Sequence, residues 1–273
     1  MPRIDALSRP SIRNLPFSVR FRGGSGDSIN FGNIYPFERT DAFSLCGYFF
    51  PTRFDTINST VIRKGATTGA ATGWGLFITN TGALSVLLAS VASGVNRINV
   101  ALTNKHRIRV CTGYFWGMAY GGLSQASDID IALVPIGRPL EAFATKATPV
   151  NDNLTSSIVN TQGLRIGATS DGLRVFGGIQ QKLSVFAGVK LTLEQFQNIY
   201  HLNRYSTPGG ASQESSRWIG EDAVGSGATV FDEVGTRDGG FLNGADWDSQ
   251  TLFNPRTVAL SRSEATALRT VAS

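Results

Sequence analysis

The stretch that decides the fold is residues 17–31, which read FSVRFRGGSGDSINF. Residues 17–22 alternate apolar and polar side chains with the period of two that is typical of a β-strand. Residues 23–27 then combine three glycines with a serine and an aspartate, a composition typical of a turn. Apolar side chains return in residues 28–31. The stretch therefore predicts two short strands joined by a tight turn, which is a β-hairpin.

Short strand-like runs continue along the chain and are separated by glycine, asparagine, aspartate and serine. Glycine accounts for 31 of the 273 residues, and charged residues for only 16%, which argues against a helix-rich fold. Strands of this length and spacing predict an all-β fold, an antiparallel jelly-roll β-sandwich. The expected strands after the hairpin are 42–50, 61–65, 74–79, 83–89, 97–102, 108–111, 115–120, 129–134, 164–167, 176–179 and 183–186.

One short helix is expected after the last of these strands. Thr192 and Gln195 have the spacing of a capping box, in which the two side chains bond to each other's backbone N–H groups. Apolar residues then recur three or four positions apart, at Leu193, Phe196 and Ile199. This pattern predicts a helix that packs over one end of the sandwich.

The chain divides into three segments by composition. Residues 1–16 contain three prolines and read as an N-terminal arm, and residues 17–205 hold the jelly roll. Residues 206–273 begin with the linker-like STPGGAS and carry nine acidic residues against five arginines. This last segment has few branched aliphatic residues, so we expect it to pack on the main domain or on a partner chain.

Several motifs, taken in order, resemble the laminin-G-like, concanavalin A-like jelly-roll family, as found in bacteriophage structural proteins. The resemblance covers about residues 17–205 and implies the same sandwich fold. Residues 225–247 are similar to strands that flank such domains in phage proteins. One departure is Tyr114-Phe115-Trp116, which stands where the family often has Trp-His-His. The motifs are VRFRGGSGDSINFGN (19–33), FSLCGYF (43–49), VIRKG (61–65), GWGLFI (73–78), NTQGLRIG (160–167) and FGGI (176–179).

No set of residues predicts catalysis. His106 and His201 are the only histidines and are expected to be structural or solvated. Asp128 and Asp130 share one face of a strand, a spacing compatible with paired carboxylates but commonplace on a solvated sheet. The sequence therefore predicts no enzyme and no catalytic residue.

Metal and cysteine chemistry are expected to be minor. Two histidines and two cysteines are too few for a zinc ribbon or a disulfide framework. Cys46 and Cys111 are expected to be two buried free thiols, and a pair between them stays open. The resemblance makes calcium an open alternative to no cofactor, with residues 151–153 and Asp128 with Asp130 as candidates.

Charge and exposed aromatics point to a protein surface as the partner. The arm carries Arg3, Arg9 and Arg13, and the C-terminal segment carries Trp218 and Trp247. These five residues are the candidate partner-docking residues, although the tryptophans could equally pin the segment to its own domain. Lysine and arginine never occur three in a row, and apolar runs stay short of about 18 residues, so neither nucleic acid nor a membrane is expected.

Two functions compete at this level. The first is a virion structural protein, a decoration or cement protein on the outer surface of a phage capsid. It would be made in the host cytoplasm and would bind the major capsid protein or another virion protein through its terminal segments. A homotrimer is expected by analogy with three-fold lattice sites. The alternative is a carbohydrate-binding adhesin or receptor-binding domain that holds glycans with the loops 66–73, 90–96 and 121–127.

Overall fold

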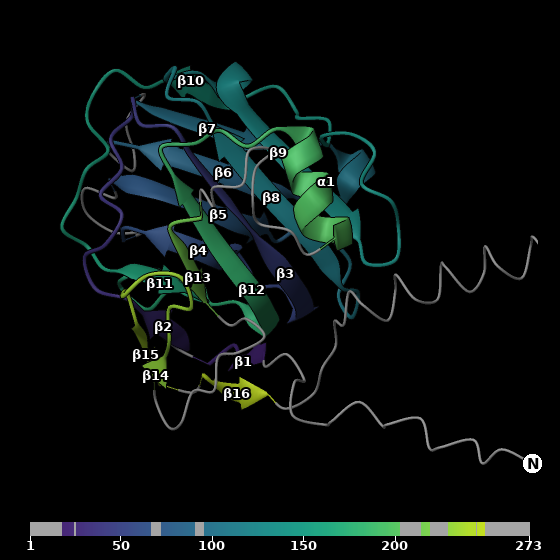
Figure 1. Cartoon of the computed structure of the whole chain (residues 1–273), viewed down its shortest axis with the longest axis vertical. Helices are drawn as coiled ribbons and strands as arrows, with labels where there is room; N and C mark the ends of the chain where they lie inside the picture. The colour runs from purple at the N-terminus through teal and green to yellow at the C-terminus, as the bar shows by residue number, and fades with distance from the viewer. Residues whose placement is uncertain are drawn as a thin grey trace, which may run out of the picture.

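The chain folds into two antiparallel sheets packed face to face, as a jelly-roll β-sandwich (Figure 1). This computed structural model describes residues 18–24, 26–66, 72–90, 96–202, 214–218, 229–243 and 245–248. Within them, the first sheet has the strand order β16-β1-β12-β3-β8-β9, with β13 also paired to β12. The second sheet has the order β10-β7-β6-β5-β4-β11-β2-β15-β14. The all-β sandwich predicted from the sequence is confirmed.

The strands of the first sheet are β1 (Ser18–Arg22), β3 (Phe43–Arg53), β8 (Tyr114–Tyr120), β9 (Ile129–Pro135), β12 (Gly177–Ala187), β13 (Ser216–Trp218) and β16 (Asp246–Asp248). Those of the second sheet are β2 (Ser28–Asn30), β4 (Asn58–Lys64), β5 (Gly73–Thr79), β6 (Leu84–Ala89), β7 (Arg97–Ala101), β10 (Asn151–Asn153), β11 (Leu164–Ile166), β14 (Thr229–Val230) and β15 (Gly239–Leu242). Two 3-10 turns, η2 (Asn104–His106) and η3 (Ala126–Asp128), and the helix α1 (Leu193–Leu202) complete the described elements.

The main core fills the space between the sheets. Alternate residues of each strand point inward, so Trp74, Leu76 and Ile78 of β5 are all fully buried in the core. Trp116 of β8 faces them from the first sheet and is also fully buried. Trp74 and Trp116 are therefore both core residues, and the remaining residues of these strands point away from the core.

Residues 17–31 do not form the predicted hairpin. β1 pairs with β12 and β16 in the first sheet, whereas β2 pairs with β11 and β15 in the second. The glycine-rich segment between them turns a corner of the sandwich, with Gly23 and Gly26 at φ of +73° and +79°. The backbone N–H of Gly24 donates to the Asp27 carboxylate at 3.1 Å. Both segments are strands, as their alternation predicts, but their ladder partners are distant in sequence.

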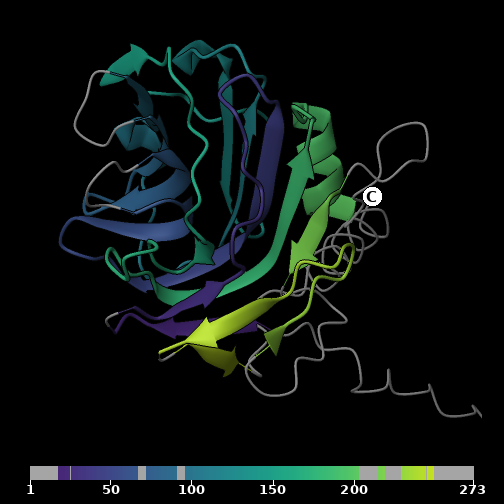
Figure 2. The same ribbon diagram turned by 90° about the vertical axis from the view of Figure 1, so that its left-hand side faces the viewer.

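Helix α1 covers the outer face of the first sheet (Figure 2). The predicted capping box is confirmed, because Thr192 N–H donates to Gln195 Oε1 at 2.8 Å and Gln195 N–H to Thr192 Oγ1 at 3.3 Å. Phe196 and Tyr200 pack on Phe115 of β8 in a second apolar cluster. A Cβ at Gly117 would lie 2.6 Å from Phe196 Cε1, so the helix approaches this closely only because residue 117 is glycine.

The region around Cys111 departs from the sequence prediction. Residues 108–111 form no strand, and Cys111 adopts a φ of +58° at an exposed turn. Cys46 is buried, as expected, and both cysteines are free thiols. The prediction of a buried Cys111 is therefore wrong. The left-handed backbone at Cys111 forms a turn, so residues 108–111 do not pair with a neighbouring strand.

The described strands of the C-terminal segment extend the two sheets of their own chain. β13 pairs with β12, β15 with β2, and β16 with β1. Trp218 is fully buried, with its ring centroid 4.2 Å from that of Phe31 and its Nε1 donating to the Arg237 carbonyl at 2.8 Å. Figure 2 shows these strands, in yellow-green, alongside the sandwich.

Asp232 ties the C-terminal strands together. Its carboxylate accepts hydrogen bonds from Ser216 Oγ at 2.6 Å and from several backbone N–H groups. Ser216 Oγ in turn lies 2.5 Å from the Tyr35 hydroxyl. Burial raises the pKa of Tyr35, so its hydroxyl stays protonated at neutral pH. A continuous polar chain thus joins the segment to the main domain.

We expect Trp218→Ala to lower the free energy of unfolding by about 3–5 kcal/mol, because it empties a fully buried aromatic site. Urea denaturation of the full chain measures the change. Val234→Ala in the same segment is the control, since Val234 is 42% exposed and should shift stability by less than about 0.5 kcal/mol. A loss below about 1 kcal/mol for Trp218→Ala would mean that the segment does not unfold with the domain.

Candidate functional site: a polar pocket on the outer face of the second sheet

The two sheets differ in what covers their outer faces. Helix α1 and its apolar cluster lie on the first sheet, whereas the second sheet carries a pocket of about 350 Å³ on its outer face. The pocket lies over β4, β5, β6 and β7, and the connection between β11 and β12 contributes Arg174. Its lining residues are Asn58, Arg63, Ala66, Phe77, Thr79, Ser85, Leu87, Arg97, Asn99 and Arg174.

Strand register builds the central row of the pocket. Arg63 of β4 stands opposite Gly75 of β5, which stands opposite Leu87 of β6, and Leu87 stands opposite Asn99 of β7. These residues alternate with inward-pointing core residues, so all of them face outward. Asn151 of β10 continues the row beyond Asn99.

Gly75 makes room for the Arg63 side chain. A Cβ at residue 75 would lie 2.6 Å from Arg63 Cδ, so any other residue there would displace the arginine. The Arg63 guanidinium lies 5.6 Å from the centre of the Phe77 ring, in cation–π contact. Arg63 is only 1% exposed and therefore forms the floor of the site.

Two further arginines complete the pocket. The Arg174 guanidinium lies 6.0 Å from the centre of the same Phe77 ring, and the Arg174 backbone has a φ of +52°. Its carbonyl accepts a 2.8 Å hydrogen bond from Thr60 N–H, which fixes the connection against β4. Arg97 Nε donates to Asn151 Oδ1 at 2.5 Å, which orients the Arg97 guanidinium along the sheet.

The pocket is electrostatically positive. Burial, and then the nearby charge of Arg174, lower the pKa of Arg63 to about 10, so Arg63 still carries its charge at neutral pH. Burial also lowers the pKa of Arg174, and the carboxylates of Asp171 and Asp55 oppose that shift. In the described part of the lining there are three arginines and no aspartate or glutamate.

The lining suits binding better than catalysis. Asn58, Asn99, Thr79 and Ser85 provide amides and hydroxyls, and Ser85 Oγ donates to Asn99 Oδ1 at 3.1 Å. Among the residues that the structure describes, the lining holds no histidine, cysteine, lysine or carboxylate that could act as a general acid, a base or an activated nucleophile. Arrays of fixed donors and acceptors of this kind recognise polar ligands.

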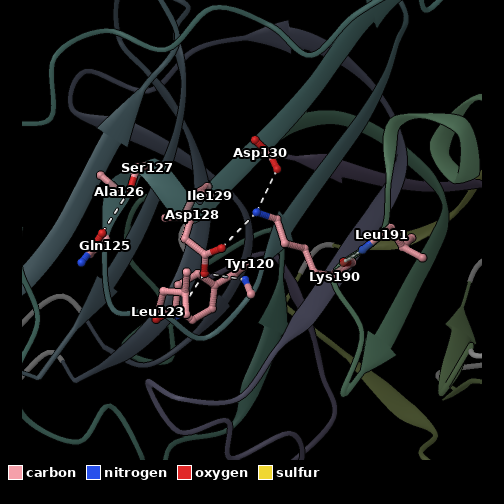
Figure 3. A network of polar contacts seen from close by, with 12 residues as sticks. Tyr120, Leu123, Gln125, Ala126, Ser127, Asp128, Ile129, Asp130, Lys190 and Leu191 are labelled. Atoms are coloured by element: carbon pink, nitrogen blue, oxygen red, sulfur yellow. Dashed lines mark hydrogen bonds and ion pairs between the residues drawn. The ribbon is translucent and has the colours of Figure 1, made fainter.

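The carboxylates considered for calcium contact one lysine and several backbone N–H groups. The Lys190 ammonium lies 3.0 Å from both Asp128 Oδ1 and Asp130 Oδ2 (Figure 3). Asp128 Oδ2 also accepts hydrogen bonds from the N–H groups of Gly121 and Leu123, at 2.8 and 3.0 Å. Burial lowers the pKa of Lys190, but its bonds to both aspartates outweigh that effect and raise it.

A second lysine, Lys146, donates hydrogen bonds to backbone carbonyl groups nearby. Lys146 Nζ donates to the carbonyls of Ala126, Ser127 and Ile129, and the Asp152 carboxylate accepts the Ala126 N–H at 2.6 Å. Among the described residues, no group of three or more histidine, cysteine, aspartate or glutamate side chains is placed to hold a metal ion. None of the helices in that part of the chain has the length and apolarity to cross a membrane.

The histidines have structural contacts. His106 Nε2 accepts the Thr145 N–H at 3.1 Å, and His201 Nε2 accepts the Leu140 N–H at 3.4 Å. Each imidazole therefore accepts a backbone hydrogen bond from a loop and helps to fix the position of that loop.

The residues predicted to dock a partner are not gathered into one surface. Arg3, Arg9 and Arg13 lie outside the described residues. Trp218 is buried against its own chain, so its ring is not available to a partner. Trp247 lies in β16 opposite Val19, and its side chain is outside the described part.

The sequence predicts a glycan site in loops rather than on a sheet face. Of the loops 66–73, 90–96 and 121–127, Ala66 alone lines the pocket, while 67–71 and 91–95 lie outside the described residues. Sequence reasoning misses the pocket arginines because they are far apart in the chain. The alternation of β5 is a usable signal, since it assigns Gly75 and Phe77 to the outer face once Trp74 is assigned to the core.

Comparison with solved structures supports the sandwich fold. One similar structure is a protein from Bacteroides ovatus proposed to bind carbohydrate, with a TM-score of 0.55 and 16% identity. The match covers 86% of this chain and 60% of that protein, so the chain spans less than two thirds of its length. At this identity the likeness shows the fold.

Two further structures are less similar. The CBM40 domain of a Ruminococcus gnavus sialidase, bound to α2,3-sialyllactose, has a TM-score of 0.41 and 14% identity over 59% of this chain and 83% of that one. Tailspike protein 2 of the Escherichia coli O157:H7 bacteriophage CAB120 has a TM-score of 0.43 and 13% identity over 68% and 24%. No protein-family model and no curated protein sequence matches the chain.

We expect Lys190→Met to lower the free energy of unfolding by about 1 kcal/mol, because it leaves the nearly buried Asp128 carboxylate without its cation. Thermal unfolding measures it, with Lys105→Met on the exposed turn η2 as the control. Calcium chloride and EDTA should leave the melting temperature of the natural chain unchanged. A rise in that temperature with calcium would contradict the assignment of these carboxylates to lysine.

Proposed function

We propose that the chain is a non-catalytic carbohydrate-binding domain whose ligand lies in the outer-face pocket of the second sheet. The observation that carries the proposal is the lining itself, whose described residues combine amides, hydroxyls and guanidinium groups and include no acid–base or nucleophilic pair. Sugars present many hydroxyls that both donate and accept, so fixed amide and guanidinium groups are suitable partners.

The size of the pocket and the rigid strands that carry its lining residues support this proposal. Its volume of about 350 Å³ is at the lower end of the range for small-ligand sites, which fits one or two sugar rings. The site is built on regular strands, and the hydrogen bonds of Arg97 and Ser85 orient its polar groups in advance. The apolar side chain of Leu87 lies mid-row and can contact the face of a sugar ring.

The Bacteroides ovatus protein adds support, because it shares the fold and is itself proposed to bind carbohydrate. Within the jelly-roll folds, we propose the laminin-G-like, concanavalin A-like type for residues 17–205, on the motifs that this stretch shares with that family. A receptor-binding or adhesin role fits a domain that recognises glycans without altering them.

The capsid-decoration hypothesis remains a proposal from the sequence, as do the virion location, the capsid-protein partner and the trimer. It depends in part on an acidic C-terminal segment that needs a surface to pack on. β13, β15 and β16 find that surface in the two sheets of the same chain, which weakens the argument for a capsid partner. Carbohydrate binding is therefore the better-supported function.

We expect Leu87→Trp to abolish glycan binding. An indole in the middle of the row would fill the pocket and exclude any ligand. A glycan array followed by isothermal titration with the strongest hit provides the measurement. Val110→Trp is the matched control, since Val110 is 43% exposed and outside both the pocket lining and the loops predicted to hold glycans. Undiminished binding by Leu87→Trp would place the glycan elsewhere, and the absence of any hit would contradict the function.

A further inference from the structure

We propose that the ligand of the outer-face pocket is an anionic saccharide, whose carboxylate or sulfate group is held by Arg97 and Arg174 above the buried Arg63. This inference rests on the proposed function, because it names the class of saccharide that the same site binds.

The pocket has a surplus of positive charge. Three guanidinium groups line one cavity of about 350 Å³, and none of the described lining residues carries a carboxylate. Two of them, those of Arg63 and Arg174, lie within 5.6 and 6.0 Å of the centre of the same Phe77 ring. Their mutual repulsion contributes to the lowered pKa of Arg63. An anion placed among them relieves that repulsion, whereas a neutral sugar leaves it unchanged.

Two acidic residues interact with these arginines from outside the pocket lining. Asp171 interacts electrostatically with Arg63, Arg165 and Arg174, and Asp55 interacts with Arg174. Asp171 is exposed, and its Oδ1 accepts the Thr169 hydroxyl at 2.5 Å. Among the described residues, these two carboxylates lie outside the pocket lining, which itself holds three arginines.

The arginines have the right position for recognition. Arg97 and Arg174 are half-buried, one at the β7 side of the pocket and one at the connection before β12. Guanidinium groups bind carboxylate and sulfate oxygens through paired, charge-assisted hydrogen bonds. Arg63 contributes charge from below, because it is almost completely buried.

The neutral polar residues of the lining favour a saccharide over an inorganic anion as the ligand. An inorganic anion would use only the guanidinium groups, whereas Asn58, Thr79, Ser85 and Asn99 extend the polar lining along the face of the sheet. These neutral groups match the hydroxyls of a sugar ring attached to the anionic group.

The test uses probes that share one neutral core. Lactose, 3′-sialyllactose and 3′-sulfolactose differ in the anionic substituent at one position, and an oligogalacturonate adds an unrelated carboxylated glycan. Titration of the full chain should give at least tenfold tighter binding for an anionic member than for its neutral counterpart. The carboxylated and sulfated arms show which anionic group the site prefers. Raising sodium chloride from about 50 to about 300 mM should weaken that binding.

Variants tie the effect to the pocket. Arg97→Gln and Arg174→Gln should each weaken anionic binding at least tenfold, and Arg97→Lys should retain part of it. Asp171→Asn should strengthen anionic binding several-fold, because it removes a competing carboxylate while keeping an acceptor for Thr169. Arg138→Gln is the control, since Arg138 is exposed and outside the lining.

The outcomes separate the two proposals. Equal or tighter binding of neutral glycans, blocked by Leu87→Trp, would overturn the anionic class and leave carbohydrate binding intact. Anionic binding that survives both Arg→Gln changes would overturn the assignment of these arginines. If no glycan of the array or of this set binds, the proposed function fails and this inference fails with it.

Discussion

The constraint on which the rest of the structure depends is the strict two-sidedness of the strands of the second sheet. Each strand sends alternate side chains into the dry core, and the others necessarily stand on the outer face. Trp74, Leu76 and Ile78 fix the inward side of β5, so Gly75 and Phe77 must face outward. The residues that stabilise the sandwich therefore also determine what its outer face presents.

The outer faces of the two sheets differ because a helix covers one and leaves the other open. On the first sheet, Phe115 and Tyr48 face outward and are buried beneath α1, which approaches closely over Gly117. On the second sheet the outward residues are arginines, amides and hydroxyls around a cavity. Burial of Arg63 under this face costs desolvation free energy, as its lowered pKa shows. Its contact with the Phe77 ring offsets part of that cost.

Local patterns in the sequence predict most elements, but long-range pairing decides the site. The capping box of α1 and the strands β5 and β8 depend on patterns a few residues long, and the structure confirms them. The prediction of a hairpin over residues 17–31 is wrong because β1 and β2 pair with strands more than a hundred residues away. The row from Arg63 through Gly75 to Asn99 likewise exists only through the register of four strands. No local pattern encodes that register, so the arginine pocket could not be predicted from the sequence.

The central claim is that the outer face of the second sheet is the binding surface, and chemical-shift mapping tests it most directly. Backbone amide signals of the full chain would be followed while 3′-sialyllactose and oligogalacturonate are titrated. The account predicts that the shifted signals cluster on Arg63, Gly75, Leu87, Arg97, Asn99 and Arg174, which belong to the row and rim of the pocket. Shifts confined to the 121–127 connection or to α1, with these signals unmoved, would contradict it.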